Sequence, residues 1–493
     1  MTTYPILTAT TFLPLLGAVA ILLFRDRLAR WIALATTLAT LAVSVPLYLR
    51  FDKTSSALQF VEGVPWIPSW NVAYGMGVDG ISLPFILLSA LVSVLCVSAS
   101  WTAIQLRVRD FYAALLVSET AMIGLFACTN FFLFYVFWEL MIVPMFLIIG
   151  VWGSAGRVYA SVKFLLFTLA GSLLMLVGLI ALLHASGTLE FQALAQTTPR
   201  LSLERQAWLF VAFSAAFAVK VPMFPVHTWL PDAHTEAPTA GSVILAGILL
   251  KMGGYGLLRI ALPILPDATR FFVKPMLGLS VVAIVYGAYV TLAQTDVKRL
   301  IAYSSISHMG FVTLGIFTLN RSGLEGAVLQ MLNHGIVTGA LFLCVGMIYE
   351  RTHTREIAEY GGLFKVAPIY STLLAFFCLA AVGFPGLNSF VGEFLIISGV
   401  FTTWPWFGVL AVWGVALGTA YILWLYSRVA LGDLRPGLRA LRLDLNAREV
   451  ATLVPLVVLA LVIGLYPESV LGVLRASVTQ LILAASGDVA GRL

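Results

Sequence analysis

Charged side chains are scarce in this chain. Aspartate, glutamate, lysine and arginine make up 11% of its 493 residues, whereas a soluble protein carries about a quarter charged residues. Hydrophobic residues reach 60%, in runs of about twenty that are long enough to cross a hydrocarbon core of about 30 Å. A transmembrane β-barrel would show short alternating segments instead. The composition therefore excludes a soluble globular protein and predicts an all-α polytopic membrane protein.

Cysteine is almost absent. Cys96, Cys128, Cys344 and Cys378 all lie in apolar stretches, without a CxxC pair or a metal-ligand spacing with histidine. We therefore interpret them as small buried apolar groups rather than as disulfide or metal sites. A Walker motif is also missing, and the glycine-rich GMGVDGIS (75–82) opens an apolar span rather than a βα unit. We expect no metal, no bound cofactor and no redox centre in this chain.

The apolar runs predict fourteen spans in a single membrane domain, residues 1–493, with boundaries good to a few residues. The predicted spans are 5–23, 30–50, 79–101, 111–130, 131–153, 159–185, 206–230, 237–262, 271–294, 298–318, 323–349, 368–400, 404–431 and 449–467. The longest predicted loops are 51–78 and 186–205.

Basic residues predict the orientation of the chain. Of 29 lysines and arginines, sixteen fall in one set of alternate loops, nine in the opposite set and the C-terminal tail, and four within spans. The first set consists of 25–30, 102–110, 154–158, 231–236, 295–299, 350–367 and 428–448. Because cytoplasmic loops carry the excess of basic residues, we place this set in the cytoplasm and both termini outside. This bias explains the net charge of +6, and no basic face or motif points to nucleic acid.

A weak internal repeat is visible in two interrupted spans. VKVPMFP (219–225) and VGFPGLNSFVGE (382–393) both place proline or glycine inside a long apolar run. Five-helix units at 111–262 and 271–431 would fit, and an odd number of helices inverts the second unit relative to the first. Paired, interrupted spans are typical of ion sites in transporters, although proline and glycine are also common in ordinary membrane helices. Residues 1–110 would be N-terminal helices, and 432–493 a C-terminal helix and tail.

Glutamates and lysines inside the spans are the strongest functional signal. Glu139, Lys220, Lys251 and Glu393 lie mid-span or beside an interruption, and two further charges, Glu119 and Lys163, lie within spans four and six. Charges in hydrocarbon are costly, so they face the protein interior or water and usually pair. Glu139 and Lys220 have opposite sign, so we predict a pair between them.

The interruption of span seven lies directly beside Lys220, and the two features have a common physical explanation. Pro222 and Pro225 break the helix and leave backbone groups without partners. Irregular backbone at membrane depth is tolerated only within protein or beside water. Water at the break would satisfy these groups and hydrate the lysine. Unlike arginine, a buried lysine can also lose its proton, so together the charges favour ion conduction over a static ion pair or a snorkelling lysine.

Histidines add a second signal. His308 and His334 lie mid-way through adjacent spans, beside Ser304 and Asn333. A buried histidine is often only a hydrogen-bonded core residue, but two on neighbouring helices favour a proton relay, since imidazole both donates and accepts.

The loop HTWLPDAHTEAP contains further polar groups with an open role. We expect His227, His234, Asp232 and Glu236 to cap and seal the broken helix, with a part in proton entry as the alternative.

At these residues the sequence resembles the antiporter-like membrane subunits of respiratory complex I. The resemblance covers nearly the whole chain and is carried by five stretches. They are FFLFYVFWELMIVPMFLIIGVWG (131–153), KVPMFPVHTWLPDAHTEAPTAGSVILAGILLKMGGYGLLR (220–259), DVKRLIAYSSISHMGF (296–311), LNHG (332–335) and FPGLNSFVGEF (384–394). An acidic Glu393, where L and N types usually have lysine, and the lack of a long lateral helix after span fourteen make it most similar to the M type.

The resemblance implies roles for individual residues. Glu139 and Lys220 would be the coupling pair, Lys251 the central proton carrier, His308 and His334 the relay, and Glu393 the group that passes the proton towards the exit. Glu119 and Lys163 would assist in hydration or coupling.

The resemblance also implies a setting. The chain would translocate protons in NADH:quinone oxidoreductase, driven by quinone reduction in partner subunits that bind NADH, FMN, iron–sulfur clusters and quinone. L-type and N-type subunits and lipids would be its neighbours, in the inner membrane of a bacterium. An Mrp-type cation/proton antiporter subunit, or a membrane subunit of an energy-converting hydrogenase or ferredoxin-linked complex, is the alternative.

Overall fold

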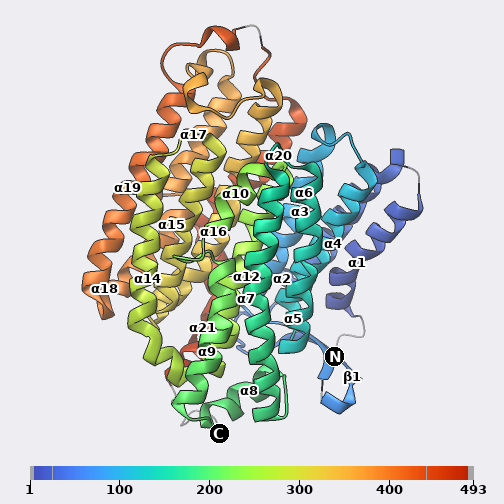
Figure 1. Ribbon diagram of the computed structural model, residues 1–493, viewed down its shortest axis with the longest axis vertical. Coiled ribbons are helices and arrows are strands. Elements are labelled where there is room, and N and C mark those ends of the chain that lie inside the picture. Colours follow the sequence, from blue (N-terminus) through green and yellow to red (C-terminus); the bar gives the residue numbers. More distant parts are fainter. Residues whose placement is uncertain (1–4, 25, 71, 440, 487–493) are drawn as a thin grey trace.

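Long helices running along one direction build the protein (Figure 1). The computed structural model describes residues 5–24, 26–70, 72–439 and 441–486. Within these residues, twelve helices are long and apolar enough to cross a membrane. The predicted termini themselves, 1–4 and 487–493, lie outside the described residues.

The first elements pack beside a small β-hairpin. They are α1 (Ile6–Leu23), α2 (Ala29–Leu49), β1 (Gln59–Ile67), β2 (Val72–Val78), α3 (Leu83–Ala103) and α4 (Val108–Ala127). The antiparallel strands β1 and β2 pair Glu62 with Met76, in a segment that we had predicted to be a loop. The carboxylate of Glu62 accepts hydrogen bonds from the backbone N–H groups of Leu7 and Thr8, at 2.7 and 3.0 Å. It thereby caps the start of α1, whose first N–H groups have no partner within the helix.

The next elements contain the first interrupted span. They are α5 (Phe131–Leu140), α6 (Ile142–Trp152), α7 (Arg157–Ser186), α8 (Phe191–Thr197), α9 (Leu203–Lys220) and α10 (Trp229–Glu236). Helix α9 ends at Lys220, and the chain crosses the break 221–228, with a cis Phe224–Pro225 bond, before α10 begins. The predicted discontinuity of span seven is confirmed.

Span eight is irregular in a different way. It consists of α11 (Thr239–Ile244), α12 (Leu250–Gly256) and α13 (Leu262–Ile264), joined by π-helical turns at Leu245–Leu249 and Leu257–Ala261. Such turns insert an extra residue into a helical turn and frequently mark functional sites.

The second half of the chain contains the other interruption. Its helices are α14 (Pro266–Leu292), α15 (Val297–Ile316), α16 (Arg321–Thr352), α17 (Pro368–Val382), α18 (Asn388–Thr403), α19 (Pro405–Ala430), α20 (Ala447–Leu465) and α21 (Glu468–Ser486). Short 3₁₀ turns lie at Asp26–Leu28, Pro68–Trp70, Thr198–Arg200, Ile357–Glu359, Leu363–Lys365 and Pro436–Leu438. Between α17 and α18 the chain turns through Gly383 and Gly386, whose φ angles of 77° and 93° suit glycine. The discontinuity of span twelve is confirmed.

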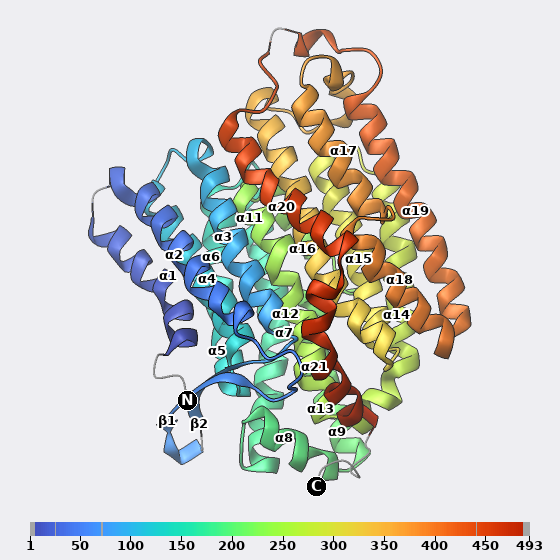
Figure 2. The ribbon, with the colours of Figure 1, turned by 180° about the vertical axis from the view of Figure 1, so that it is seen from behind.

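The two ends of the bundle differ. The hairpin β1–β2 and the end of α21 lie at one end, which we call the hairpin end. The segments 353–367, 431–439 and 441–446 lie at the other, the loop end (Figure 1). Figure 2 shows α20 and α21 crossing the back of the bundle one after the other. We had treated the residues after 467 as a tail, so α21 is a correction. The span count of fourteen and the inverted repeats remain predictions.

Candidate functional site

Helix α16 provides the centre of a polar site. The most apolar part of this helix is completely buried. Gln330, Asn333 and His334 lie on one face, because residues three and four apart are neighbours on a helix. This face packs against α18, which begins directly after the second interruption.

Lys251 contacts this face from span eight. Its Nζ lies 2.7 Å from His334 Nδ1, and it also donates to the carbonyl oxygen of Ala246. Ala246 belongs to the π-helical turn that precedes α12, five residues before the lysine. Lys251 is fully buried, so the π turn and the imidazole together supply the partners that a buried ammonium requires.

The row continues through a second histidine to an acid. The rings of His334 and His308 are 6.0 Å apart between centroids, and His308 Nδ1 lies 3.3 Å from Glu393 Oε1. Gln330 Nε2 donates to the same carboxylate oxygen at 3.0 Å. Lys251, His334, His308 and Glu393 therefore form one row, contributed by α12, α16, α15 and α18. The structure brings these four predicted site residues together.

Buried amides with free hydrogen-bonding groups surround the acidic end of the row. Asn388 is fully buried, and neither atom of its carboxamide has a hydrogen-bond partner among the described residues. The same holds for Gln330 Oε1, Asn333 Oδ1 and His334 Nε2. Such groups are almost always satisfied, by protein or by ordered water. We had not predicted Gln330 and Asn388. The spacing of Gln330 from His334 on one helix face was the available signal.

Lys220 and Glu139 do not form the predicted ion pair. Lys220 is fully buried at the end of α9, and within the part of the chain that the structure describes its Nζ and Glu139 Oε1 both lack a hydrogen-bond partner. The ammonium instead lies over the ring of Trp138, 5.0 Å from its centroid, where the negative face of the aromatic ring attracts a cation. Trp138 precedes Glu139 on α5, so the lysine and the acid are neighbours without direct contact.

Glu119 and Lys163, for which we expected an assisting role, have different surroundings. Glu119 on α4 is fully buried, and neither carboxylate oxygen has a hydrogen-bond partner in the described ranges. Lys163 on α7 makes an ion pair with Asp232, with 2.7 Å between Nζ and Oδ2, and Arg299 lies 3.6 Å from the other oxygen. Lys163 therefore joins α7 to α10 at the loop end and stands apart from the row.

The remaining loop residues divide between capping and burial. Glu236 accepts hydrogen bonds from the Ser154 hydroxyl at 2.7 Å and the Gly156 N–H at 2.8 Å, so it caps the start of α7 rather than the broken helix. His227 stacks on Phe224. His234 is fully buried against the ring of Phe342, 4.6 Å away between centroids, and no described residue forms a hydrogen bond with either ring nitrogen.

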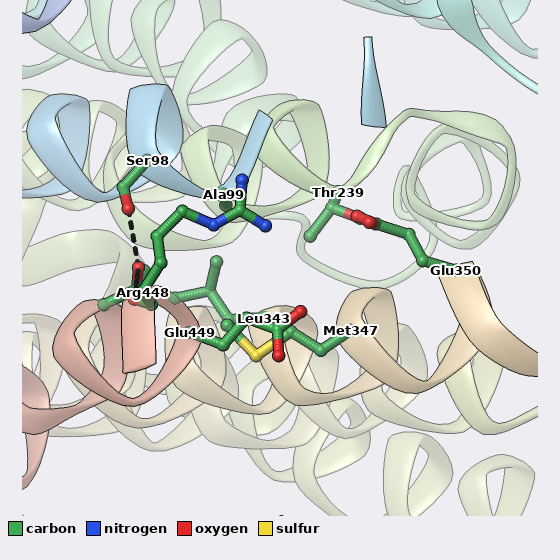
Figure 3. Close-up of a pocket in the computed structure, with 9 residues that line it drawn as sticks. Ser98, Ala99, Thr239, Leu343, Met347, Glu350, Arg448 and Glu449 are labelled. Atoms are coloured by element: carbon green, nitrogen blue, oxygen red, sulfur yellow. Dashed lines mark hydrogen bonds between the residues drawn. The ribbon is translucent and has the colours of Figure 1, made fainter. Parts of the chain in front are cut away.

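Two hollows lie at the loop end, close to Glu236 and the start of span eight. One cavity has a volume of about 10 Å³, which is room for about one water molecule. Figure 3 shows residues that line it, Thr239, Glu350 and Arg448 among them. A larger hollow of about 470 Å³ shares Thr239 and Glu350 and extends to Glu236 and Lys298. The two hollows thus extend along the loop end to the start of span eight. Among the described residues, no group of three or more histidines, cysteines or acids is placed to hold a metal ion.

Comparison with known proteins places this geometry in a family. The family model described as NADH:quinone oxidoreductase/Mrp antiporter, TM, matches residues 128–418, more than half of the chain. NADH-quinone oxidoreductase subunit M of Rhodobacter capsulatus is 46% identical over 97% of this chain and 96% of its own.

Solved structures agree with this assignment. A chain of respiratory complex I from Thermus thermophilus with bound NADH superimposes with a TM-score of 0.88 at 31% identity, covering 97% of this chain and 99% of that one. A chain of the Mrp complex from Dietzia sp. DQ12-45-1b reaches 0.87 at 20% identity, covering 98% of this chain and 100% of that one, which shows a shared fold. The chain belongs to the family of NADH:quinone oxidoreductase and Mrp antiporter membrane subunits, and within it to the M-type subunits of complex I.

Proposed function

We propose that this chain is a proton-translocating membrane subunit of NADH:quinone oxidoreductase, driven by quinone reduction in partner subunits. The observation that carries the proposal is the row Lys251–His334–His308–Glu393, in which four buried titratable side chains from four helices follow one another. Such groups inside a membrane helix bundle mark ion and proton pathways.

The geometry of the row accounts for each transfer. Lys251 and His334 are within direct hydrogen-bonding distance, so a proton passes between them without an intermediary. The centroids of the two imidazole rings are 6.0 Å apart, and a bridging water would connect their nitrogens. His308 then passes the proton to Glu393, on the half-helix α18 that runs to the hairpin end (Figure 1).

The interruption beside Glu393 is part of this arrangement. Gly383 lies close to the acid, because an added Cβ there would come 2.9 Å from Glu393 Oε2. The carboxamide of Asn388 and the side-chain oxygens of Asn333 and Gln330 would hold water around this end of the row. Water both donates and accepts hydrogen bonds, so such a cluster suits proton movement.

Lys220 and Glu139 would couple the row to a neighbouring subunit. Glu139 is only partly buried, on the flank formed by α5 and α6. A change of charge at that flank would act on Lys220, which is held by the ring of Trp138 rather than by an ion pair. The hydrated loop end beside Glu236 and Lys298 would supply the proton, through His234, to Lys251.

The setting of the chain follows from its family. We assign NADH, FMN, iron–sulfur clusters and quinone to partner subunits and no redox centre to this chain. Its flanks would contact the L-type and N-type antiporter-like subunits, in a bacterial inner membrane with the loop end in the cytoplasm. The two interrupted spans support two inverted units at 111–262 and 271–431.

Purification of the tagged chain from its native membrane tests this proposal. We expect a large assembly that contains flavin and iron–sulfur clusters, reduces quinone with NADH, and acidifies one side of liposomes when reconstituted. Arrival with cation-transport subunits and without redox cofactors would contradict it and favour an Mrp-type antiporter. Hydrogenase or ferredoxin-linked activity would contradict the assigned electron donor.

A further inference from the structure

A layer of aromatic rings lies between the polar row and the hairpin end in the first half of the bundle. Tyr255, one turn beyond Lys251, packs against Phe126 at 5.1 Å and Phe134 at 6.5 Å between ring centroids. Three further rings extend the layer, and its members are Phe85, Phe126, Phe134, Trp138, Phe217 and Tyr255. All six side chains are fully or almost fully buried.

Helix α12, which carries Lys251, packs closely against Phe217 of this layer. An added Cβ at Gly256 would come 2.5 Å from the Phe217 ring, and one at Gly253 would come 2.7 Å from the Phe217 carbonyl oxygen. Glycine at both positions therefore permits an approach that a side chain would prevent. The aromatic layer closes tightly around α12 on the side away from the loop end.

A buried ion pair lies just beyond the aromatic layer. Arg259 Nη2 is 2.8 Å from Asp79 Oδ2, with side-chain exposures of 20% and 7%. Arg259 Nε donates to the Tyr255 hydroxyl at 3.1 Å. Asp79 Oδ1 also accepts from the backbone N–H groups of Ile81 and Ser82 at the start of α3. The guanidinium is thus fixed from two sides, at the hairpin end of the aromatic layer.

This pair has no place in the proton route through Glu393. Arg259 follows Lys251 by eight residues, about 12 Å of helix rise. A proton on Lys251 has two directions: through His334 to Glu393, or along its own helix to the hairpin end. Fixed positive charge at a narrow point excludes protons and cations from aqueous pores.

We propose that the aromatic layer and Arg259 form a seal that prevents the proton on Lys251 from reaching the hairpin end along span eight. The inference rests on the proposed function, since a seal has meaning only beside a proton route. The aromatic rings exclude water, and the guanidinium opposes the approach of a proton. At an effective dielectric constant of about 20, a unit charge about 12 Å away changes the occupancy of a proton roughly tenfold.

Opposite substitutions in the pair separate this role from a structural one. Arg259→Met removes the positive charge and leaves Asp79 negative, so the barrier becomes attractive for protons. Asp79→Asn leaves the positive charge, and asparagine keeps the oxygen that caps α3. A pair that only holds helices together would respond alike to both changes, whereas a charge barrier opens only when its positive charge is removed.

The experiment measures passive proton conductance in liposomes that contain the intact complex, after a pH jump and without NADH. We expect Arg259→Met to raise conductance about tenfold or more, Arg259→Lys and Asp79→Asn to leave it at the wild-type level, and Arg259→Met/Asp79→Asn to give an intermediate rise. The matched control is Glu449→Gln, which alters another buried ion pair, with Arg351, at the loop end. It should leave conductance unchanged.

Two results would overturn the seal: conductance that does not rise in Arg259→Met, or an equal rise in Arg259→Met and Asp79→Asn. The amount of intact complex is measured for each variant. If Arg259→Met does not assemble, the double variant carries the test, since it leaves no buried charge unpaired. NADH-driven acidification by the wild-type liposomes tests the proposed function separately, so failure of the seal and failure of proton pumping give different results.

Discussion

The contact between Lys251 and His334 joins two side chains that can each hold one proton. The lysine has no acidic partner within the described part of the chain, and its contacts are an imidazole nitrogen and a carbonyl oxygen. A carboxylate at this position would hold the proton on lysine through a strong ion pair. An imidazole can accept the proton instead, which suits the proposed transfer between the two side chains.

Replacement of Lys251 therefore tests proton transfer at the level of one atom. We expect Lys251→Met to lower NADH-driven proton pumping by about tenfold or more. We expect Lys251→Arg to lower it similarly, since arginine keeps the charge but does not release its proton. Acidification of reconstituted liposomes provides the measurement, with the amount of assembled complex as the control. Normal pumping in an assembled Lys251→Arg complex would show that this residue need not lose its proton.

Interruptions of helices place the site at the level of elements. Helix α9 ends at Lys220, α18 begins at Asn388, and π-helical turns flank α12. Each interruption frees backbone groups or redirects side chains at membrane depth, where only protein or water can satisfy them. Polar side chains collect at these interruptions for the same reason.

Close approach of α16 and α18 depends on a glycine. An added Cβ at Gly392 would come 2.5 Å from Gln330 Oε1. We expect Gly392→Ala to displace Gln330 from Glu393, to destabilise the protein by about 1–3 kcal/mol, and to lower pumping. Gly278→Ala on α14 is the control, since an added Cβ there meets no atom within 4 Å. Thermal unfolding and liposome acidification provide the readouts, and equal behaviour of the two variants would contradict the predicted contact.

The cap on α7 gives a prediction away from the polar row. Glu236→Ala removes the acceptor for the Ser154 hydroxyl and the Gly156 N–H, and we expect a loss of about 1–2 kcal/mol in stability. Glu359→Ala, at an exposed position in the 353–367 segment, should change little. The midpoint of thermal unfolding of the complex distinguishes the two. An unchanged midpoint in Glu236→Ala would mean that solvent replaces this cap.

At the scale of the whole molecule, the polar residues extend from one flank to another. Glu139 lies on α5, and Glu393 lies on α18 at a separate flank of the bundle (Figure 1). Exposed apolar residues accompany both acids, with Val143 60% and Phe394 59% exposed. Apolar side chains at these places suit contact with other membrane subunits or with lipid.

Cross-linking tests whether two different neighbours cover these flanks. We expect Val143→Cys and Phe394→Cys, in the native complex, each to cross-link to a different subunit. The four native cysteines are buried, so they should give little background, and the buried Ala288→Cys provides a negative control. Mass spectrometry identifies the products. Cross-links from both positions to the same subunit, or to none, would contradict the proposed arrangement of neighbours.

Most of the site could be found from the sequence, because charge in an apolar span is conspicuous. Lys251, His308, His334 and Glu393 were predicted individually, and the structure brings them together. Gln330 and Asn388 were not predicted, since a neutral amide in a membrane helix has no comparable signal. The Glu139–Lys220 pair was predicted from charge sign alone. Lys220 instead lies over the ring of Trp138, and this contact depends on side-chain positions rather than on composition.

The sequence by itself determined the class of the protein and its two interruptions, because hydrophobicity and proline or glycine act locally along the chain. Only the tertiary structure decided the hairpin β1–β2, helix α21 and the order Lys251–His334–His308–Glu393. It also decided the Arg259–Asp79 pair, whose members are 180 residues apart in sequence. Contacts of this kind depend on which helices pack together, and the apolar pattern of each span is too uniform to specify that.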